Sequence, residues 1–364
     1  MKNVLCLSSG LMPQYRLDIL RAIALPKHAT IQFRYSKQLV HPDLHDAFTG
    51  DRAVGRRVLL GHVDGNSSRL RNDRACPITL CREGSLERTQ RSGSYFVLQI
   101  SLGSMVSHDW EQAQTKIESV RPRHEDDANR GSQEHHPGLS GFWCFETALT
   151  ATPECKLDSI GMWEASVKQL WQSPDFQKQP FFFAVEGLYA CARPRVKWQS
   201  MSEGHFNLRA DREYELRVLH WHPEVDSLPS LNRDTTMTVG VESPQLRPIT
   251  SPRLAIDSPY DVKAYRVRTG ASTKEEFASF VVKIEGADGK PVTDQPEIFL
   301  PVRIKPSYFK VGSLTVVLAG LLWLQQLVPL LSKGPVDRVV AWVTLLVSAI
   351  AAFVVVFGIK KPLS

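Results

Sequence analysis

Residues 313–331, SLTVVLAGLLWLQQLVPLL, and residues 339–358, VVAWVTLLVSAIAAFVVVFG, contain no charged side chain, and the link SKGPVDR joins them. The apolar core of a bilayer is about 30 Å thick, and roughly 20 mainly apolar helical residues cross it. Each run has that length. The pattern therefore predicts that residues 306–364 form a C-terminal two-helix transmembrane hairpin.

Small and polar residues within the two runs suggest what the hairpin does. Gln325 and Gln326 lie in the middle of the first run, where polar side chains are costly and turn towards protein or water. Ser348 and Ala352 form a pair of small residues that permits close helix packing. These four residues predict self-association of the spans. The alternative is a simple anchor in which the glutamines bond to the partner helix.

Basic residues flanking the runs predict the orientation of the hairpin. Two of them, Lys333 and Arg338, lie in the link, whereas five lie on the side that holds both ends of the chain: Arg303, Lys305, Lys310, Lys360 and Lys361. Basic residues concentrate on the cytoplasmic side of a membrane. The first ten residues, MKNVLCLSSG, lack the apolar region of a secretory signal. These features predict a multi-pass protein of the inner (cytoplasmic) membrane, with both termini and the soluble body in the cytoplasm.

The opening of the chain predicts a β-α-β unit. Val4 to Ser8 has the apolar character of a buried strand, Gln14 to Leu25 has helical periodicity, and Ala29 to Tyr35 suggests a second strand. The turn Ser8-Ser9-Gly10 then faces the start of the helix, where backbone N–H groups hold anions. Ser8, Ser9 and Gly10 are therefore candidate ligand contacts together with Arg16, although an ordinary strand-to-helix turn has the same pattern.

Residues 51–91 are rich in arginine and add two further candidates. The segment holds nine arginines against five acidic residues, which is a net charge of +4 (9 − 5): Arg52, Arg56, Arg57, Arg69, Arg71, Arg74, Arg82, Arg88 and Arg91 against Asp51, Asp64, Asp73, Glu83 and Glu87. Arginine suits phosphate because its planar fork donates two parallel hydrogen bonds. Arg56 and Arg57 are therefore predicted to contact a nucleotide or another anionic ligand. The alternative is a solvated basic face.

Further apolar runs divide the remainder of the chain into two regions. A strand-rich α+β domain is predicted over residues 1–199, acting as a sensor or ligand-binding domain. Its expected strands are Arg57 to Val63, Ala75 to Arg82, Tyr95 to Leu102, Gly141 to Thr147 and Pro180 to Ala192, and its second expected helix is Trp163 to Trp171. Regular strands then predict an immunoglobulin-like β-sandwich over residues 200–305, and they include Glu213 to Trp221 and Thr236 to Val241.

Catalytic and metal-binding patterns give no candidate. The sequence has no phosphate-binding glycine loop, no nucleophile elbow and no paired cysteine spacing typical of structural zinc. We therefore predict no catalytic residue, no metal site and no cofactor. This lowers the expectation of an enzyme without excluding one.

In layout, a cytosolic body on a short transmembrane hairpin is similar to bacterial immune and stress effectors that permeabilise the inner membrane. No residue motif carries this similarity. It implies a membrane-anchored sensor and effector that self-associates in a stress or phage-defence (antiviral) response. The alternatives are a membrane-tethered enzyme acting on a nucleotide or phosphorylated substrate, and a tethered scaffold. The expected partners are the lipid bilayer, further copies of the chain, an anionic ligand and a protein encoded nearby.

Overall fold

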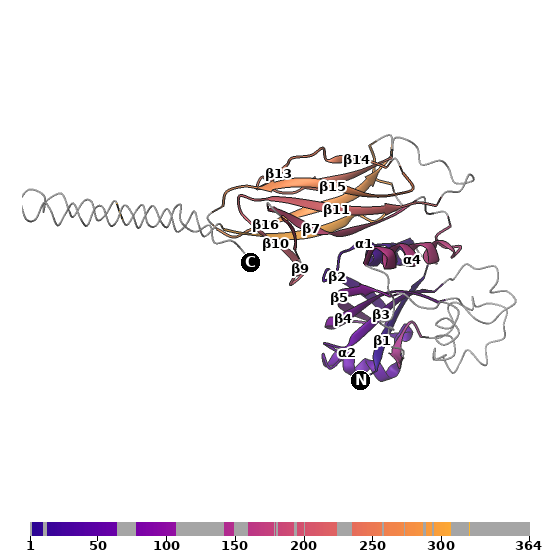
Figure 1. Ribbon diagram of the computed structural model, residues 1–364. Coiled ribbons are helices and arrows are strands. Elements are labelled where there is room, and N and C mark those ends of the chain that lie inside the picture. The colour runs from indigo at the N-terminus through magenta and orange to yellow at the C-terminus, as the bar shows by residue number, and fades with distance from the viewer. Residues whose placement is uncertain are drawn as a thin grey trace, which may run out of the picture.

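A computed structural model describes most of the chain before residue 307. The described residues are 2–9, 13–63, 78–106, 142–148, 159–177, 179, 181–192, 195–199, 201–223, 235–256, 258–272, 274–286, 289–292, 295–306 and 320. Strands make up 56% of these residues and helices 17%. The strands form three sheets, and Figure 1 shows them as layers with two helices between the first sheet and the other two.

The first sheet has the strand order β2-β5-β4-β3-β1-β6. Its strands are β1 (Asn3–Ser9), β2 (Thr30–Ser36), β3 (Arg57–Val63), β4 (Ile78–Ser92), β5 (Tyr95–Met105) and β6 (Cys144–Thr147). β1 and β3 are parallel, and the other pairs are antiparallel. α1 (Pro13–Ala24) connects β1 to β2, and η1 (Lys37–Leu39) and α2 (Pro42–Thr49) lie between β2 and β3.

The second and third sheets come from the remainder of the chain. The second has the order β13-β15-β11-β7-β8, and the third has the order β14-β12-β16-β17-β10-β9. The strands of the second sheet are β7 (Phe182–Ala192), β8 (Arg195–Gln199), β11 (Glu213–Trp221), β13 (Leu246–Pro248) and β15 (Tyr260–Thr269). Those of the third are β9 (Met201–Ser202), β10 (His205–Arg209), β12 (Thr236–Val241), β14 (Arg253–Ala255), β16 (Glu276–Glu285) and β17 (Ile298–Lys305).

Burial along the strands follows from their place in these layers. β1 is buried at six consecutive positions because both of its faces are covered, as a continuous apolar run predicts. β2 and β17 alternate between buried and accessible positions, as strands with one covered face do. Inward-facing residues of the second and third sheets, such as Tyr265 and Phe280, belong to the same large core.

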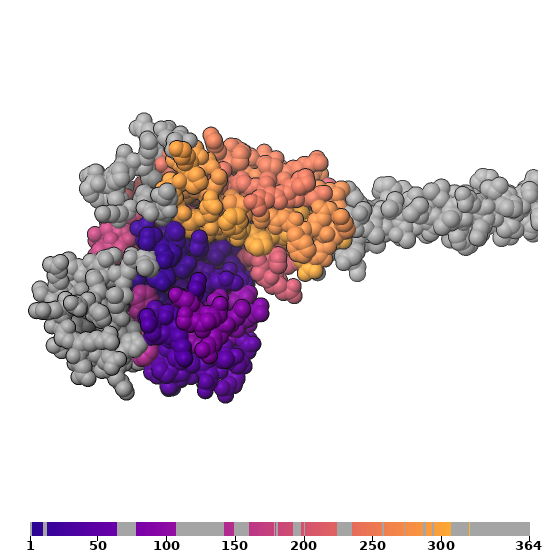
Figure 2. All heavy atoms as spheres, turned by 180° about the vertical axis from the view of Figure 1, so that it is seen from behind, coloured from indigo at the N-terminus to yellow at the C-terminus, as the bar shows by residue number. Residues whose placement is uncertain are grey.

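Two helices join the first sheet to the second. α1 and α4 (Ser159–Trp171) contribute Ile23, Trp163 and Leu170 to a separate core cluster. The same cluster contains Cys81 from the first sheet and Phe182 from the second. In Figure 2 the indigo and purple N-terminal residues lie directly against the salmon-to-orange strands. The helices therefore hold the two parts of the chain together through an apolar layer.

Several predicted elements coincide with the observed ones. Arg57 to Val63, Glu213 to Trp221 and Thr236 to Val241 are β3, β11 and β12, and the opening β-α-β unit is β1, α1 and β2. The helix predicted from Trp163 to Trp171 is the later part of α4. Period and length identify these elements because each one buries a face of its own.

The predicted C-terminal two-helix transmembrane hairpin is not supported. Apart from Gly320, the runs at 313–331 and 339–358 lie outside the described residues, as do Gln325, Gln326, Ser348 and Ala352. Within the ranges that the structure describes, no helix is both long and apolar enough to cross a membrane. α1 and α4 have 12 and 13 residues, whereas a span needs roughly 20.

The correction extends to the architecture, the keywords and the localisation that were predicted from those runs, whereas self-association stays a prediction. The hairpin in the fold class, the membrane keywords and the multi-pass placement in the inner membrane are contradicted by the strand-rich, three-sheet architecture. The physical reason is that a charge-free run shows only a preference to leave water. Its helical form and its lipid surroundings were assumptions of the sequence argument.

The immunoglobulin-like sandwich over residues 200–305 is also wrong as an account of this region. β7 and β8 come from before residue 200, yet they belong to the second sheet, where β7 pairs with β11 on one side and with β8 on the other. β10 and β17 form a parallel pair in the third sheet. Hydrophobic alternation identifies a strand with one buried face, but it does not show which distant strand becomes its neighbour.

Candidate functional site

The residues predicted to form an anion site lie at opposite ends of two parallel strands. Ser8 and Ser9 are buried at the end of β1, and the Ser8 hydroxyl donates a hydrogen bond to the carbonyl oxygen of Tyr15 at 2.8 Å. Arg16 follows in α1, and Gly10 lies outside the described residues. Ser8 therefore uses its hydroxyl to hold the first turn of α1.

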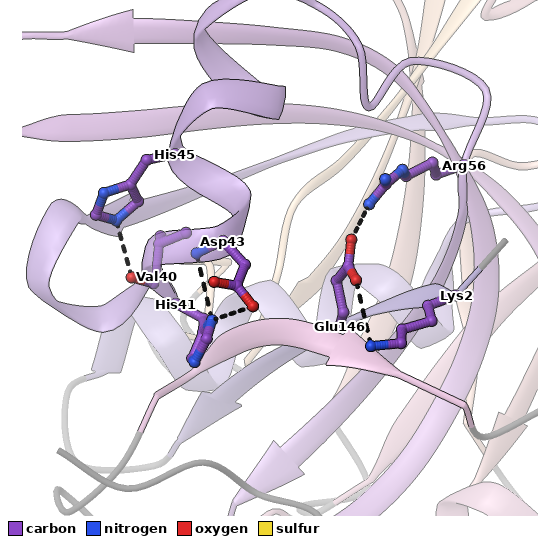
Figure 3. A network of polar contacts seen from close by, with 7 residues as sticks. All are labelled: Lys2, Val40, His41, Asp43, His45, Arg56 and Glu146. Carbon is purple, nitrogen blue, oxygen red and sulfur yellow. Dashed lines mark hydrogen bonds and ion pairs between the residues drawn. The ribbon is translucent and has the colours of Figure 1, made fainter. Parts of the chain in front are cut away.

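Arg56 and Arg57 are located at the start of β3. Ser8 is in register with His62, five residues further along β3 than Arg57, which is about 16 Å. Arg57 pairs with Glu83, and Arg56 pairs with Glu146. Figure 3 shows Glu146 between Arg56 and Lys2. The structure thus keeps these two arginines apart from the serine turn and supplies each with a carboxylate, while the ligand role of the serine turn stays a prediction.

A cavity of about 410 Å³ lies elsewhere, at the junction of the first and second sheets. One wall consists of the end of α1, the end of β5 and the first turn of α4. The opposite wall comes from β7, β8 and β11. Small-molecule sites usually have volumes of roughly 300–1,000 Å³ and often lie between two parts of a fold. We call this cavity the junction cavity.

Arg82 is the buried cation of the junction cavity. Arg82 is 3% exposed. Its guanidinium donates hydrogen bonds to the carbonyl oxygens of Gly103 at 3.0 Å, Ala22 at 2.6 Å and Leu25 at 2.5 Å. No carboxylate of the described residues forms an ion pair with it. Burial lowers the pKa of Arg82 to about 9, so the group remains protonated at neutral pH. Its hydrogen bonds attach the end of α1 to the end of β5.

Further positive charge surrounds Arg82. Lys27 lines the junction cavity and is exposed, with no ion pair to any carboxylate that the structure describes. The pKa of His28 is lowered, first by burial and then by the charges of Lys27 and Arg82. The carbonyl end of α1 supplies a compensating charge of only about half a unit.

The helical wall of the junction cavity is held in place by a fully buried contact between a histidine and an aspartate. His62 Nε2 of β3 lies 3.0 Å from Asp175 Oδ2, in the turn that follows α4. The ring of Phe176 packs edge-on against His62 at 4.8 Å. These contacts lock the end of α4 onto the first sheet. Ile160 and Met162 at the other end of the helix then face the cavity as apolar lining.

The sheet wall changes character at a β-bulge. The pairing of β7 with β11 shifts between Arg217 and Val218, which leaves Glu186 without a partner in the register. Bulges re-aim side chains next to binding sites, and Glu186 lines the junction cavity. Its carboxylate accepts a hydrogen bond from Tyr189 Oη at 2.7 Å. Before the bulge, Phe182 and Ala184 belong to the core cluster of the two helices, and after it Tyr189 is half-buried.

Sequence reasoning counted Arg82 among nine arginines without singling it out. One signal for it exists, since Arg82 follows the apolar residues Ile78, Leu80 and Cys81 in a single strand. A cation in a run of buried positions needs a partner, and local sequence offered none. Among the residues that the structure describes, no group of three or more His, Cys, Asp or Glu side chains lies close enough to hold a metal ion.

Comparison with known proteins adds no family. No family model and no curated protein matches the chain. Among solved structures, a Bacteroides ovatus GH5 xyloglucanase is 13% identical with a TM-score of 0.18, covering 30% of this chain and 19% of that enzyme. The Vibrio cholerae VesB protease is 8% identical with a TM-score of 0.18, covering 69% of this chain and 88% of the protease. Scores of this size show no common fold.

Proposed function

We propose that the protein is a sensor that binds a small anionic ligand in the junction cavity. The observation that carries this proposal is Arg82, a buried guanidinium that borders the cavity and lacks a carboxylate partner among the described residues. Sequence reasoning expected an anionic ligand but attached it to other arginines. Among the described arginines, Arg82 is the buried one, and a bound anion would supply the charge that its carbonyl partners lack.

The energetics favour an anion over a neutral ligand. A buried charge is costly unless it is paired and hydrogen-bonded. Carbonyl oxygens satisfy three of the donor contacts of Arg82, yet they supply only partial charge. A phosphate or carboxylate bound beside Arg82 and Lys27 adds charge-assisted hydrogen bonds, which are about twice as strong as neutral ones.

The position of the junction cavity explains how occupancy is sensed. Its two walls belong to different sheets, so a bound ligand contacts both parts of the chain. A ligand that binds only the native state stabilises it by about 2.7 kcal/mol when its concentration is 100 times its Kd. Ligand binding is therefore expected to fix the first sheet, with α1 and α4, against the second.

The test is a thermal shift screen of the full chain with inorganic phosphate, ribose 5-phosphate and AMP. A rise in melting temperature that saturates with concentration is expected for at least one of them. The variant Lys27→Gln should weaken that response. Arg57→Gln serves as the matched control, because Arg57 already pairs with Glu83. If none of the three anions raises the melting temperature, the proposal is wrong.

The same screen addresses the alternative predicted from the sequence, an enzyme acting on a nucleotide or phosphorylated substrate. Product appearing on incubation with a bound nucleotide favours the enzyme, and binding without turnover favours the sensor. Self-association and a partner protein encoded nearby stay predictions. Analytical ultracentrifugation of the full chain with and without the bound anion would test the first of these.

A further inference from the structure

Trp198 is a large apolar side chain left accessible at the rim of the junction cavity. It lies on β8, at the edge of the second sheet, and is 45% exposed. The cavity is lined in part by this indole. The aromatic core residue Trp163, which lines the same cavity from α4, is 2% exposed. Folding buries one tryptophan of the cavity and leaves the other in contact with water.

Gly187 fixes the position of the Trp198 indole. A Cβ atom built on Gly187 would lie 2.5 Å from Trp198 Nε1 and 3.1 Å from Trp198 Cδ1. The indole therefore lies against the backbone of β7 at Gly187, and glycine leaves room for it because it has no side chain. Any side chain at this position would displace the ring, because real Cβ atoms do not approach other heavy atoms so closely. The indole is thus packed against the backbone of β7 at Gly187.

The neighbours of Trp198 are fixed as well. Tyr189 is directly opposite Trp198 in the pairing of β7 with β8. The Tyr189 hydroxyl is held by Glu186, and the guanidinium of Arg217 lies over the Tyr189 ring at 4.4 Å from its centroid. Arg217 in turn pairs with Glu215 at 2.8 Å. The indole thus lies beside an ordered polar network, and no large rearrangement is needed before a ring can stack on it.

We propose that the ligand of the junction cavity carries a planar aromatic ring that stacks on Trp198, with its anionic group at Arg82 and Lys27. This inference rests on the proposed function and names its ligand class, an aromatic or heteroaromatic acid of the size of a nucleoside monophosphate. The face of an exposed indole can stack on any flat aromatic ring. Trp198 is then the residue that determines specificity for the ring.

The experiment compares AMP with ribose 5-phosphate on the full chain by isothermal titration calorimetry. The two probes share the phosphate and the sugar, and only AMP carries an aromatic ring. We expect AMP to bind roughly 10-fold more tightly, since loss of one base–aromatic stack costs about that factor or more. Trp198→Ala should reduce AMP binding to the level of ribose 5-phosphate, and Trp198→Phe should retain part of the preference.

The remaining outcomes separate the two proposals. Equal binding of the two probes overturns the aromatic ligand class while the anion sensor stands. A preference for AMP that survives in Trp198→Ala overturns the assignment to Trp198. Absence of binding for AMP, ribose 5-phosphate and inorganic phosphate overturns both proposals. Melting temperatures of the two variants must stay close to the parent value, which is expected because the indole is half-exposed.

Discussion

Arginines at two neighbouring strands of the same sheet, Arg56 and Arg57 at β3 and Arg82 in β4, have opposite surroundings. Arg56 and Arg57 begin β3 at the accessible end of the sheet, and each pairs with a glutamate. Arg82 belongs to β4, is buried, and bonds only to backbone carbonyls. The density of arginines drew attention to the first group, whereas the missing counter-charge distinguishes the second. A charge marks a binding site when its own fold leaves it uncompensated.

The comparison predicts the largest difference in stability. Arg82→Met is expected to lower the free energy of unfolding by about 3 kcal/mol, because three backbone carbonyls lose a charged donor. Arg56→Met should cost about 1 kcal/mol or less, as partly exposed ion pairs do. Urea denaturation of the two full-length variants measures both values. Equal losses would show that the buried Arg82 contributes no more to stability than the partly exposed Arg56 does.

The aromatic rim of the junction cavity should be separable from its cationic centre. Gly187→Ala forces the Trp198 indole off β7, and we expect it to reduce AMP binding roughly 10-fold with ribose 5-phosphate unaffected. Gly240→Ala is the control, since a Cβ atom there meets its nearest neighbour at an ordinary 3.8 Å. Calorimetry with both probes gives the two ratios. An equal loss for both probes would mean that the backbone of β7, rather than the ring, had been disturbed.

The accessible cation at the rim should have a smaller effect. Lys27→Gln is expected to weaken phosphate binding about three-fold without changing the melting temperature, because exposed ion pairs contribute up to about 1 kcal/mol. The loss should shrink as salt is added, since exposed charges are screened. Arg57→Gln, measured by the same titration, should leave the affinity unchanged. If it weakens binding as much as Lys27→Gln, the anion is attracted by overall charge and the contrast between the two groups fails.

The smallest expected effect is a dependence on pH at His28. Burial, with the charges of Lys27 and Arg82, lowers the pKa of His28 from its ordinary value of 6.5, so the unfolded chain binds a proton more readily than the folded one. This residue therefore lowers stability as the pH falls through 6.5, with the loss complete below the lowered folded-state pKa.

Replacement of His28 tests this sign directly. His28 has a φ angle of 69°, which asparagine also adopts, so His28→Asn is a conservative change. The stability of the variant relative to the parent should rise between pH 7 and pH 5 in chemical denaturation. A difference that is constant over this range would show that neither burial nor the charges of Lys27 and Arg82 lower the pKa of His28.

Local pattern determined many of the elements. The six buried positions of β1, the helical period of α1 and the alternation of β2 and β17 appear directly in the residue order, since each reflects which faces of the element are covered. β3, β11 and β12 have the bounds that their apolar runs predict. The same reasoning predicted an anionic ligand, which stays a prediction.

Only the tertiary structure decided where these elements meet. The pairing of β7 with β11, the parallel pair of β10 and β17, and the packing of α1 and α4 between two sheets join residues far apart in the chain. The junction cavity draws its walls from seven helices and strands, so no local pattern contains it. Whether an arginine is compensated depends on which carboxylates the fold brings to it, which is why Arg56 and Arg82 look alike in the sequence and differ in the folded protein.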